Sequence, residues 1–280
     1  MTITARIIKD SVSPFGVRLT TFILSYPRFI HSEVMTHRMF SRNASSSRAI
    51  PFPKQMAAIK QDMAKPLAFL ANQKGMQAGE KLSPWRSKAC FAVWRLSGLV
   101  AIGFAKVLSA LGAHKQYVNR LVEPYAHITV VLTGTDESFA NWFALRDHPA
   151  AQPEICELAK QMRRCYETST PEKLPIGWWH LPFVETPKQA PDNWGPLIRR
   201  SVACCARTSY NNHDGTEPDD LKDAILNNQL LSSTPMHASP SEHQAMCIGG
   251  FRQSGNFYGW LQYRKTLQGE YVTTLVKESK

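Results

Sequence analysis

The chain has 280 residues, of which 43% are hydrophobic and 20% charged, and its formal net charge is +11. This composition is typical of a globular protein and excludes a disordered one, and the length allows one large domain or two small ones with an ample core. The positive charge favours an anionic partner: a nucleotide, a phosphate-bearing cofactor or a polynucleotide. Because the basic residues are scattered and the longest run is a pair, small anions are favoured over a duplex.

Residues 89–105 are the one stretch apolar enough to suggest a membrane span. Arg95 interrupts this stretch, and the uninterrupted part is about half of the ~20 residues that a span requires. We therefore expect a buried helix and no membrane partner. The first residues lack the apolar core and cleavage site of a signal peptide, which favours a cytoplasmic protein. The six cysteines show neither CxxC pairs nor metal-ligand spacing, so we expect reduced, mostly buried thiols.

The first third of the chain predicts a strand and a helix. Residues 17–24 are rich in β-branched and aromatic side chains and predict the strand. Ser25 then suits the cap of a helix with Pro27 in its first turn. On this helix Glu33 and His37 would share a face, because they are four residues apart. Residues 41–47, rich in Asn and Ser, predict a polar loop.

Between residues 54 and 166 the pattern is mostly helical, with one short strand at residues 127–132. The Pro-rich stretch 167–197 predicts a long crossover, and Pro240 predicts a helix start with Glu242 and His243 in its first turn. The C-terminal region, aromatic and basic, predicts a strand, a turn and a helix. The expected helices are 54–72 (kinked or ended by Pro66), 83–111, 114–122, one ending at Arg146, 151–166, 200–210 and 219–229.

Residues 28–48 combine arginines, serines and amides with hydrophobic spacers, as one wall of an anion-binding pocket would. Neither GxGxxG nor GxxxxGK[ST] occurs, so arginines and hydroxyls would have to hold a phosphate. Arg48, Arg120 and Arg146 each lie beside a break in regular structure and are candidates; for each alone, a structural ion pair is the alternative. His37, His237 and His243 have acidic neighbours but not the spacing of metal ligands, and we expect no metal site.

Together these segments resemble the flavin-dependent thymidylate synthase family. The signature of that family is Arg-His-Arg followed at fixed spacing by Ser, Asn-Glu, Ser and Arg. The matching residues are Thr36, His37, Arg38, Ser41, Asn43, Ala44, Ser46 and Arg48. Further family blocks are matched by Asn141, Arg146, Ala151, Gln152 and Glu154, by Arg120 and Pro124, by residues 206–210 (Ala-Arg-x-Ser-Tyr) and by residues 237–243 (His-x-Ser-Pro-x-Glu-His).

The last two blocks precede the signature in the family but follow it here, as in a circular permutation with residues 167–197 as the joint. Two signature positions also differ: Thr36 replaces an arginine and Ala44 a glutamate. Gln262, Arg264 and Lys265 are candidates to replace the lost groups.

The resemblance implies an α+β fold, with a mixed or antiparallel sheet flanked by helices. It also implies one catalytic domain over residues 1–280, in which 1–166 holds the signature and the Asn141–Glu154 block and 198–280 the permuted blocks. The implied activity is reductive methylation of dUMP to dTMP, with methylenetetrahydrofolate as carbon donor and NADPH as reductant through FAD. Family members are homotetramers with sites shared between subunits.

The resemblance also implies roles for individual residues. Arg146 is expected at the pyrimidine, with Ser46 and His237 as further catalytic residues. The expected FAD-binding residues are His37, Arg38, Met39, Asn141, Ser239 and Glu242. The expected substrate-binding residues are Arg48, Arg120, Arg146, Glu33 and Ser46. A basic nucleic-acid-binding protein, or an inactive paralogue that retains the scaffold, is the alternative that Thr36 and Ala44 keep open.

Overall fold

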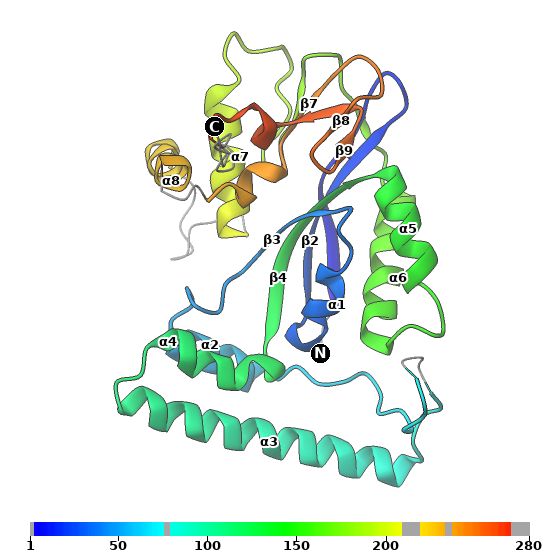
Figure 1. Ribbon diagram of the computed structural model, residues 1–280, viewed down its shortest axis with the longest axis vertical. Coiled ribbons are helices and arrows are strands. Elements are labelled where there is room, and N and C mark those ends of the chain that lie inside the picture. Colours follow the sequence, from blue (N-terminus) through cyan, green and yellow to red (C-terminus); the bar gives the residue numbers. More distant parts are fainter. Residues whose placement is uncertain (1–2, 76–78, 209–218, 233–236, 270–280) are drawn as a thin grey trace, which may run out of the picture.

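The computed structural model describes residues 3–75, 79–208, 219–232 and 237–269 (Figure 1). Its centre is a five-stranded sheet in the order β3-β4-β2-β1-β5. The β1–β5 pair is parallel and the others are antiparallel, so the sheet is mixed and the predicted α+β class is confirmed. Its strands are β1 (Thr4–Val12), β2 (Arg18–Pro27), β3 (Ser41–Ala44), β4 (His127–Thr135) and β5 (Glu172–Lys173).

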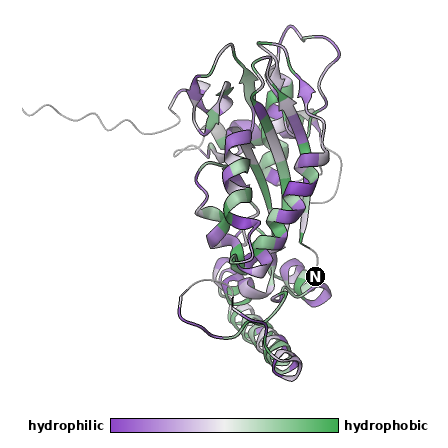
Figure 2. Cartoon of the chain, turned by 90° about the vertical axis from the view of Figure 1, so that its right-hand side faces the viewer, coloured by the Kyte–Doolittle hydropathy of each residue, from purple (hydrophilic) through white to green (hydrophobic). Residues whose placement is uncertain are grey.

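Helices α5 (Asp136–Arg146) and α6 (Pro153–Thr168) cover one face of this sheet. Their apolar residues pack on inward-facing residues of β2 and β4, and Phe22, Phe139 and Trp142 are fully buried at the centre of this core. Seen from the helical side, hydrophilic and hydrophobic residues alternate along these helices, as in amphipathic helices (Figure 2). This is the one-sided pattern that lets a sheet and its helices share a core.

A second group of helices lies beyond one end of the sheet. Its small core includes Phe52, Ile59, Ile102 and Val122. The helices are α2 (Phe52–Gln61), α3 (Pro84–Ala110), α4 (Lys115–Val118) and the 3-10 helix η2 (Asn119–Tyr125).

The part of the chain after β5 builds the other end. A three-stranded sheet in the order β10-β7-β6 stands beside α7, which is joined to α8 by a buried ion pair from Arg207 to Asp223. The elements are β6 (Trp179–His180), α7 (Gly195–Arg207), α8 (Asp220–Ser232), the 3-10 helix η3 (Ser239–Glu242), β7 (Ala245–Cys247), β8 (Gln253–Ser254), β9 (Phe257–Tyr258), β10 (Trp260–Gln262) and the 3-10 helix η4 (Tyr263–Thr266).

Two expectations for the signature region are wrong. Strand β2 runs on to Pro27, and only the short helices η1 (Arg28–Ile30) and α1 (His31–Met35) follow, so His37 lies outside any helix. Ser25 is a strand residue, paired with Thr129. Of the segment 41–47 expected as a loop, residues 41–44 form β3, because the edge of β4 offers them backbone partners, whereas residues 45–47 lie outside regular structure as expected.

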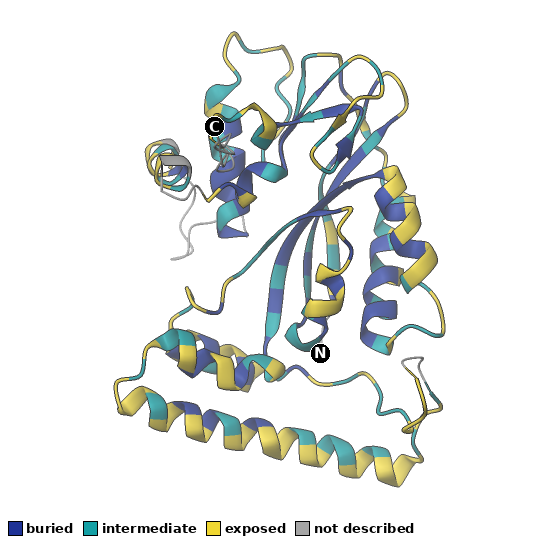
Figure 3. Ribbon diagram, in the orientation of Figure 1, coloured by how far each residue is buried: buried dark blue, intermediate teal, exposed yellow. Residues whose placement is uncertain are grey.

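Helix α3 also differs from expectation. Its bounds agree with the prediction, but of its 27 residues only Gly98, Ile102 and Ala105 are buried, and most of its surface is exposed (Figure 3). Helix α2 ends at Gln61, well before Pro66, and Glu242 and His243 belong to a single 3-10 turn and its C-cap. Residues 209 and 210 of the Ala-Arg-x-Ser-Tyr block lie outside the described residues.

A fully buried row of hydroxyls and imidazoles joins the C-terminal region to the central sheet. The His180 ring hydrogen-bonds with Ser11 Oγ (2.9 Å) and Thr21 Oγ1 (2.8 Å). Thr21 Oγ1 also hydrogen-bonds with Thr133 Oγ1 (2.8 Å), and Thr133 Oγ1 hydrogen-bonds with His243 Nδ1 (2.8 Å). All five side chains have 0% exposure. Burial lowers the pKa of both histidines, that of His243 to about 3, so both rings are neutral.

These depressed pKa values predict acid destabilisation. Unfolded histidine titrates near ~6.5, so the stability gained by keeping His243 neutral is complete above that pH and is lost as the pH falls below it. At pH 5, His243 alone should lower the free energy of unfolding by about 2 kcal/mol relative to pH 8. Urea unfolding at the two pH values measures the difference.

His243→Gln should show a smaller drop between pH 8 and pH 5 than the wild type. His148→Gln, at an exposed position, is the matched control and should keep the full drop. Equal drops in all three proteins would contradict a buried neutral His243.

Candidate functional site

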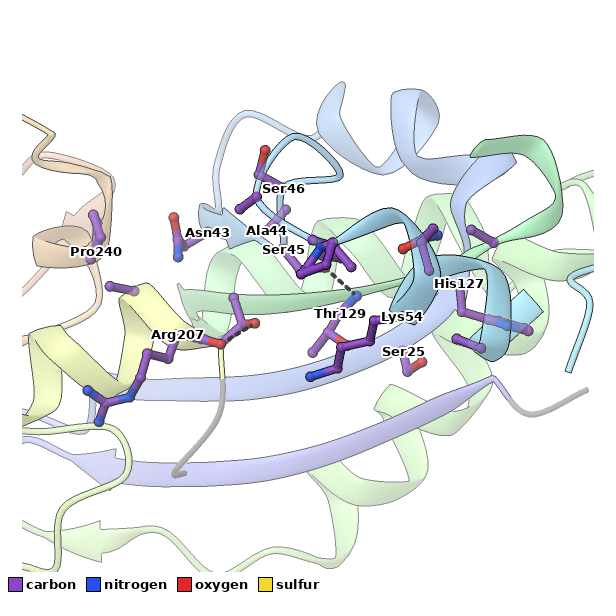
Figure 4. A pocket seen from close by; sticks show the side chains of 18 of the residues that line it. Ser25, Asn43, Ala44, Ser45, Ser46, Lys54, His127, Thr129, Arg207 and Pro240 are labelled. Carbon is purple, nitrogen blue, oxygen red and sulfur yellow. Dashed lines mark hydrogen bonds between the residues drawn. The ribbon is translucent and has the colours of Figure 1, made fainter. Parts of the chain in front are cut away.

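A cavity of about 1070 Å³ lies between the signature segment and the C-terminal region. Segments far apart in the sequence line it: residues 43–46 and 49–51, one side of α2 along its length, the start of β4, the end of α7, residues 237–240, and single residues of β1, β2 and α8. Figure 4 shows Asn43 and Pro240 on one side and Lys54 and His127 on the other. We call this space the main cavity.

Asn43 fixes the two C-terminal walls of the main cavity. Its Nδ2 donates to the backbone oxygen of Cys205 (2.7 Å), near the end of α7. Its Oδ1 accepts from Ser239 Oγ (3.2 Å), at the start of η3. One amide on β3 therefore positions two segments more than 150 residues away in sequence. On the opposite side, Ser45 Oγ accepts from the Thr129 backbone N–H (3.2 Å).

The wall of the main cavity is more apolar than polar, and hydroxyl, amide and basic side chains are distributed over it. Lys54 reaches into the cavity, whereas the Arg207 guanidinium turns away toward Asp223 (Figure 4). Asp62 is the one carboxylate among the described residues that line the cavity, and it lies 3.9 Å from His127 Nδ1. Burial lowers the pKa of His127 more than Asp62 raises it. With many donors and little negative charge, these walls suit an anionic ligand with hydrogen-bonding edges.

Arg146 belongs to a different group of side chains. Its Nε donates to His37 Nε2 (2.7 Å), and the His37 ring stands edge-on to Trp142 with centroids 4.5 Å apart. Beside this pair, Asn141 Nδ2 approaches Met39 Sδ at 3.6 Å. We call the surface formed by His37, Arg38, Met39, Asn141 and Arg146 the Arg146 face. None of these residues lines the main cavity.

The environment of His37 keeps its ring neutral. Burial lowers its pKa to about 4, with further contributions from the cations Arg146 and Arg42. Since Arg146 donates to Nε2, that nitrogen must carry the lone pair, which fixes the tautomer. Arg42 Nη1 also donates to the His37 backbone oxygen (3.0 Å). His37 thus holds the Arg146 guanidinium in place without cancelling its charge.

The C-terminal region also reaches the signature through Gln262 and Arg264. Gln262 Nε2 donates to Ser41 Oγ (3.0 Å) and to the backbone oxygen of Glu242 (2.9 Å). Arg264 forms an ion pair with the Glu242 carboxylate. These two residues, singled out as candidate replacements for the lost signature groups, therefore contact residues of two motif blocks.

Glu123 forms ion pairs with two arginines near the other end of the signature. It pairs with Arg28 (3.1 Å) and Arg120 (3.1 Å) and accepts a hydrogen bond from Ser47. The alternative interpretation of Arg120, a structural ion pair, thus describes its contact in this chain. Arg48, by contrast, is exposed.

The structure distributes the expected site residues over several places. Ser46, His237 and Ser239 line the main cavity, and Glu242 lies beside it in η3. Glu33 is exposed on α1 and hydrogen-bonded to Ser32. Sequence reasoning missed Lys54, Gln55 and His127, which line the cavity from segments without a recognisable motif. Among the described residues, no group of three or more His, Cys, Asp or Glu could hold a metal ion.

Comparisons with known proteins add three findings. The model of the family described as thymidylate synthase complementing protein (Thy1) matches residues 3–172. The chain is also similar to two solved structures of a UMP/dUMP methylase, PolB from Streptomyces cacaoi, one bound with 5-Br UMP and one with 5-Br dUMP. Both have a TM-score of 0.50 and 17% sequence identity to this chain. Each alignment covers 59% of this chain, and the two cover 88% and 90% of the respective PolB chain. At that identity the likeness concerns the fold. Comparison with curated proteins gave no match.

The contact between His37 and Arg146 predicts a linked titration. Removing the guanidinium with Arg146→Ala should raise the pKa of His37 from about 4 toward its usual value, because one of the two nearby cations is gone. Histidine NMR signals followed from pH 3 to pH 8 measure this pKa. Arg38→Ala, at a neighbouring exposed position, should leave it unchanged. An unchanged His37 pKa in Arg146→Ala would refute the contact.

Proposed function

Because the chain belongs to the thymidylate synthase complementing protein family, as the match over residues 3–172 shows, we propose that it methylates dUMP to dTMP. Methylenetetrahydrofolate would supply the carbon and NADPH the reducing equivalents, through FAD. The resemblance read from the motifs is thereby confirmed at the level of the family. The fold shared with a UMP/dUMP methylase supports a uridine-type nucleotide as substrate.

The main cavity is the observation that carries this proposal. Its volume of about 1070 Å³ is ample for a nucleotide, and its donors match a phosphate and a pyrimidine edge. The signature segment contributes one wall and residues 237–240 another, so two blocks far apart in sequence meet in one space. This meeting supports the permuted order of the blocks, which stays a prediction, because the family match ends at residue 172.

The donor set also fits a flavin dinucleotide. The main cavity offers Ser46, Ser239 and Lys54, and the Arg146 face offers the exposed Arg38 and Asn141. Charge-assisted bonds from such groups suit a pyrophosphate. Bound FAD would supply the hydride for reduction. We propose that His37, Arg38, Met39, Asn141, Ser239 and Glu242 hold it.

The chemistry proposed for this chain's own residues is mainly electrostatic. Arg146, aimed by neutral His37, would place a fixed positive charge at a pyrimidine carbonyl and stabilise negative charge that develops there. Ser46 and His237, which line the main cavity, would be the further catalytic residues. Arg48, Arg120 and Glu33 would orient the nucleotide, with Arg120 exchanging its contact to Glu123 for the phosphate.

Because the Arg146 face and the main cavity do not share residues, we propose that a complete site combines the two from different subunits. A homotetramer in the cytoplasm, as the family resemblance implies, accommodates this arrangement. The proposal that residues 1–280 form a single catalytic domain is consistent with the contacts from η3 and β10 to β3.

The activity has a direct test. The purified protein should be yellow or become yellow with added FAD, and it should release tritium from 5-tritiated dUMP when folate and NADPH are present. Free flavin and heat-treated protein are the controls. A colourless protein that does not bind FAD and binds DNA tightly at low salt would refute the proposal and favour the nucleic-acid-binding alternative.

Arg146→Ala tests the alignment of the motif blocks. Removing a charge-assisted contact worth up to about 3 kcal/mol should weaken dUMP binding by about two orders of magnitude. Calorimetric titration with dUMP gives the affinity, and circular dichroism checks the fold. Arg164→Ala, an exposed arginine on α6, is the control and should bind like the wild type. Unchanged dUMP affinity in Arg146→Ala would place the pyrimidine elsewhere.

A further inference from the structure

Helix α3 exposes a continuous apolar stripe that nothing in the described part of the chain covers. One side of the helix packs on its own core through Gly98, Ile102 and Ala105. The opposite side carries large apolar side chains spaced by three or four residues, which keeps them in line at about 100° per residue. The α3 stripe consists of Val93, Leu96, Val100, Phe104, Val107 and Leu111, the last directly after the helix, and their exposures lie between 48% and 77%.

The stripe is comparable in size to the largest apolar patches of soluble proteins, which are often functional. Burying a large apolar side chain contributes about 1.5–3 kcal/mol, and at about 25 cal/mol per Å² this free energy corresponds to roughly 100 Å² of surface. Six such residues, each about half to three-quarters exposed, present on the order of 400 Å², and Trp85 extends the surface. Single-chain soluble proteins rarely leave larger patches uncovered, and each partner of a stable complex buries about 800 Å².

A groove beside the stripe gives it a shape that can receive a side chain. The groove has a volume of about 510 Å³ and runs between α3 and Leu121 of η2, past the small residues Ser97 and Ala101. On the other edge of the stripe, Gly103 has open space where a Cβ would stand. Glycine inside an exposed helix costs about 1 kcal/mol relative to alanine, and no crowding within this chain requires it. A second helix that approaches closely would require a small residue there.

The spacing of the stripe identifies the partner as a second copy. Relative to Ile102, the six residues stand at positions −9, −6, −2, +2, +5 and +9. This near-palindrome lets an antiparallel α3 from a second copy place Val100 opposite Phe104 and Val93 opposite Leu111, and such self-complementarity is the property of a two-fold interface.

The charges of α3 are compatible with that pairing. The helix has no acidic residue, and its cations Lys88, Arg95 and Lys106 lie on one flank, about 80° or more from each residue of the stripe. Arg86 is in line with the stripe, but at position −16 relative to Ile102 it lies beyond Leu111 of an antiparallel partner. The cations therefore do not meet across an antiparallel pair. Helix α3 is also long and apolar enough to cross a membrane, but its buried side is fixed to the core of its own chain.

We propose that two copies of this chain dock through their α3 stripes in antiparallel orientation, with Phe104 of each copy entering the groove of the other. This inference rests on the stripe alone and is independent of the proposed nucleotide chemistry.

Sedimentation velocity and light scattering on the full chain test the interface. The wild type should be a dimer or a multiple of one, and Phe104→Glu should halve the assembled mass. Gly103→Leu is the second variant: the added side chain meets open space within the chain, so folding is preserved while close helix approach is blocked. Lys88→Glu, on the opposite flank, should keep the wild-type mass. Circular dichroism and thermal melting confirm folding of each variant.

Orientation is tested by cross-linking. Val93→Cys chains mixed with Leu111→Cys chains should form a disulfide-linked pair on mild oxidation, whereas Val93→Cys alone should not. Cross-linking of Val93→Cys with itself would overturn the antiparallel arrangement. A monomeric wild type, an unchanged mass in both Phe104→Glu and Gly103→Leu, or binding of a monomer to anionic phospholipid vesicles through α3 would overturn the proposal.

Discussion

The buried row of hydroxyls and neutral imidazoles is the interaction on which the site depends. His180 and His243 come from the region beyond the family match, whereas Thr21 and Thr133 belong to the matched sheet. Since Ser239 lies four residues before His243, docking His243 on β4 also places one wall of the main cavity. A charged imidazole in this row would lack compensating charge and would be costly to bury. The same bonds that assemble the site therefore limit it to pH values at which both rings are neutral.

Ion pairs decide how much of the net charge of +11 is available to a ligand. Arg120 is held by Glu123, and Arg264 by Glu242, so much of their positive charge is offset within the chain. Arg146 differs, because its partner is a neutral ring that accepts a hydrogen bond and leaves the charge intact. An arginine positioned in this way keeps its full field for a ligand, which is the arrangement that electrostatic catalysis requires.

Periodicity predicted the long elements well, and local composition predicted the signature region poorly. Strand β2 and helices α3, α5 and α6 follow from their apolar patterns. The pattern of residues 41–47 reads as a loop, because Asn and Ser favour turns; pairing with β4 overrides that preference at residues 41–44. The apolar composition of α3 predicted burial, but composition does not reveal whether the covering surface belongs to the same chain. Likewise the motifs identified Ser46 and His237, whereas Lys54 and His127 reach the cavity only through the tertiary fold.

The separation of the Arg146 face from the main cavity has a structural cause. Arg146 ends α5, whose Trp142 is fully buried in the central core and packs against His37. Turning the Arg146 side chain away from its present position would break the hydrogen bond to His37. A second chain can bring the two surfaces together without that cost. The exposed α3 stripe gives an independent reason for assembly, since its apolar surface is stabilised only when covered. Two features of the same fold, one polar and one apolar, thus support the proposal of a partner chain.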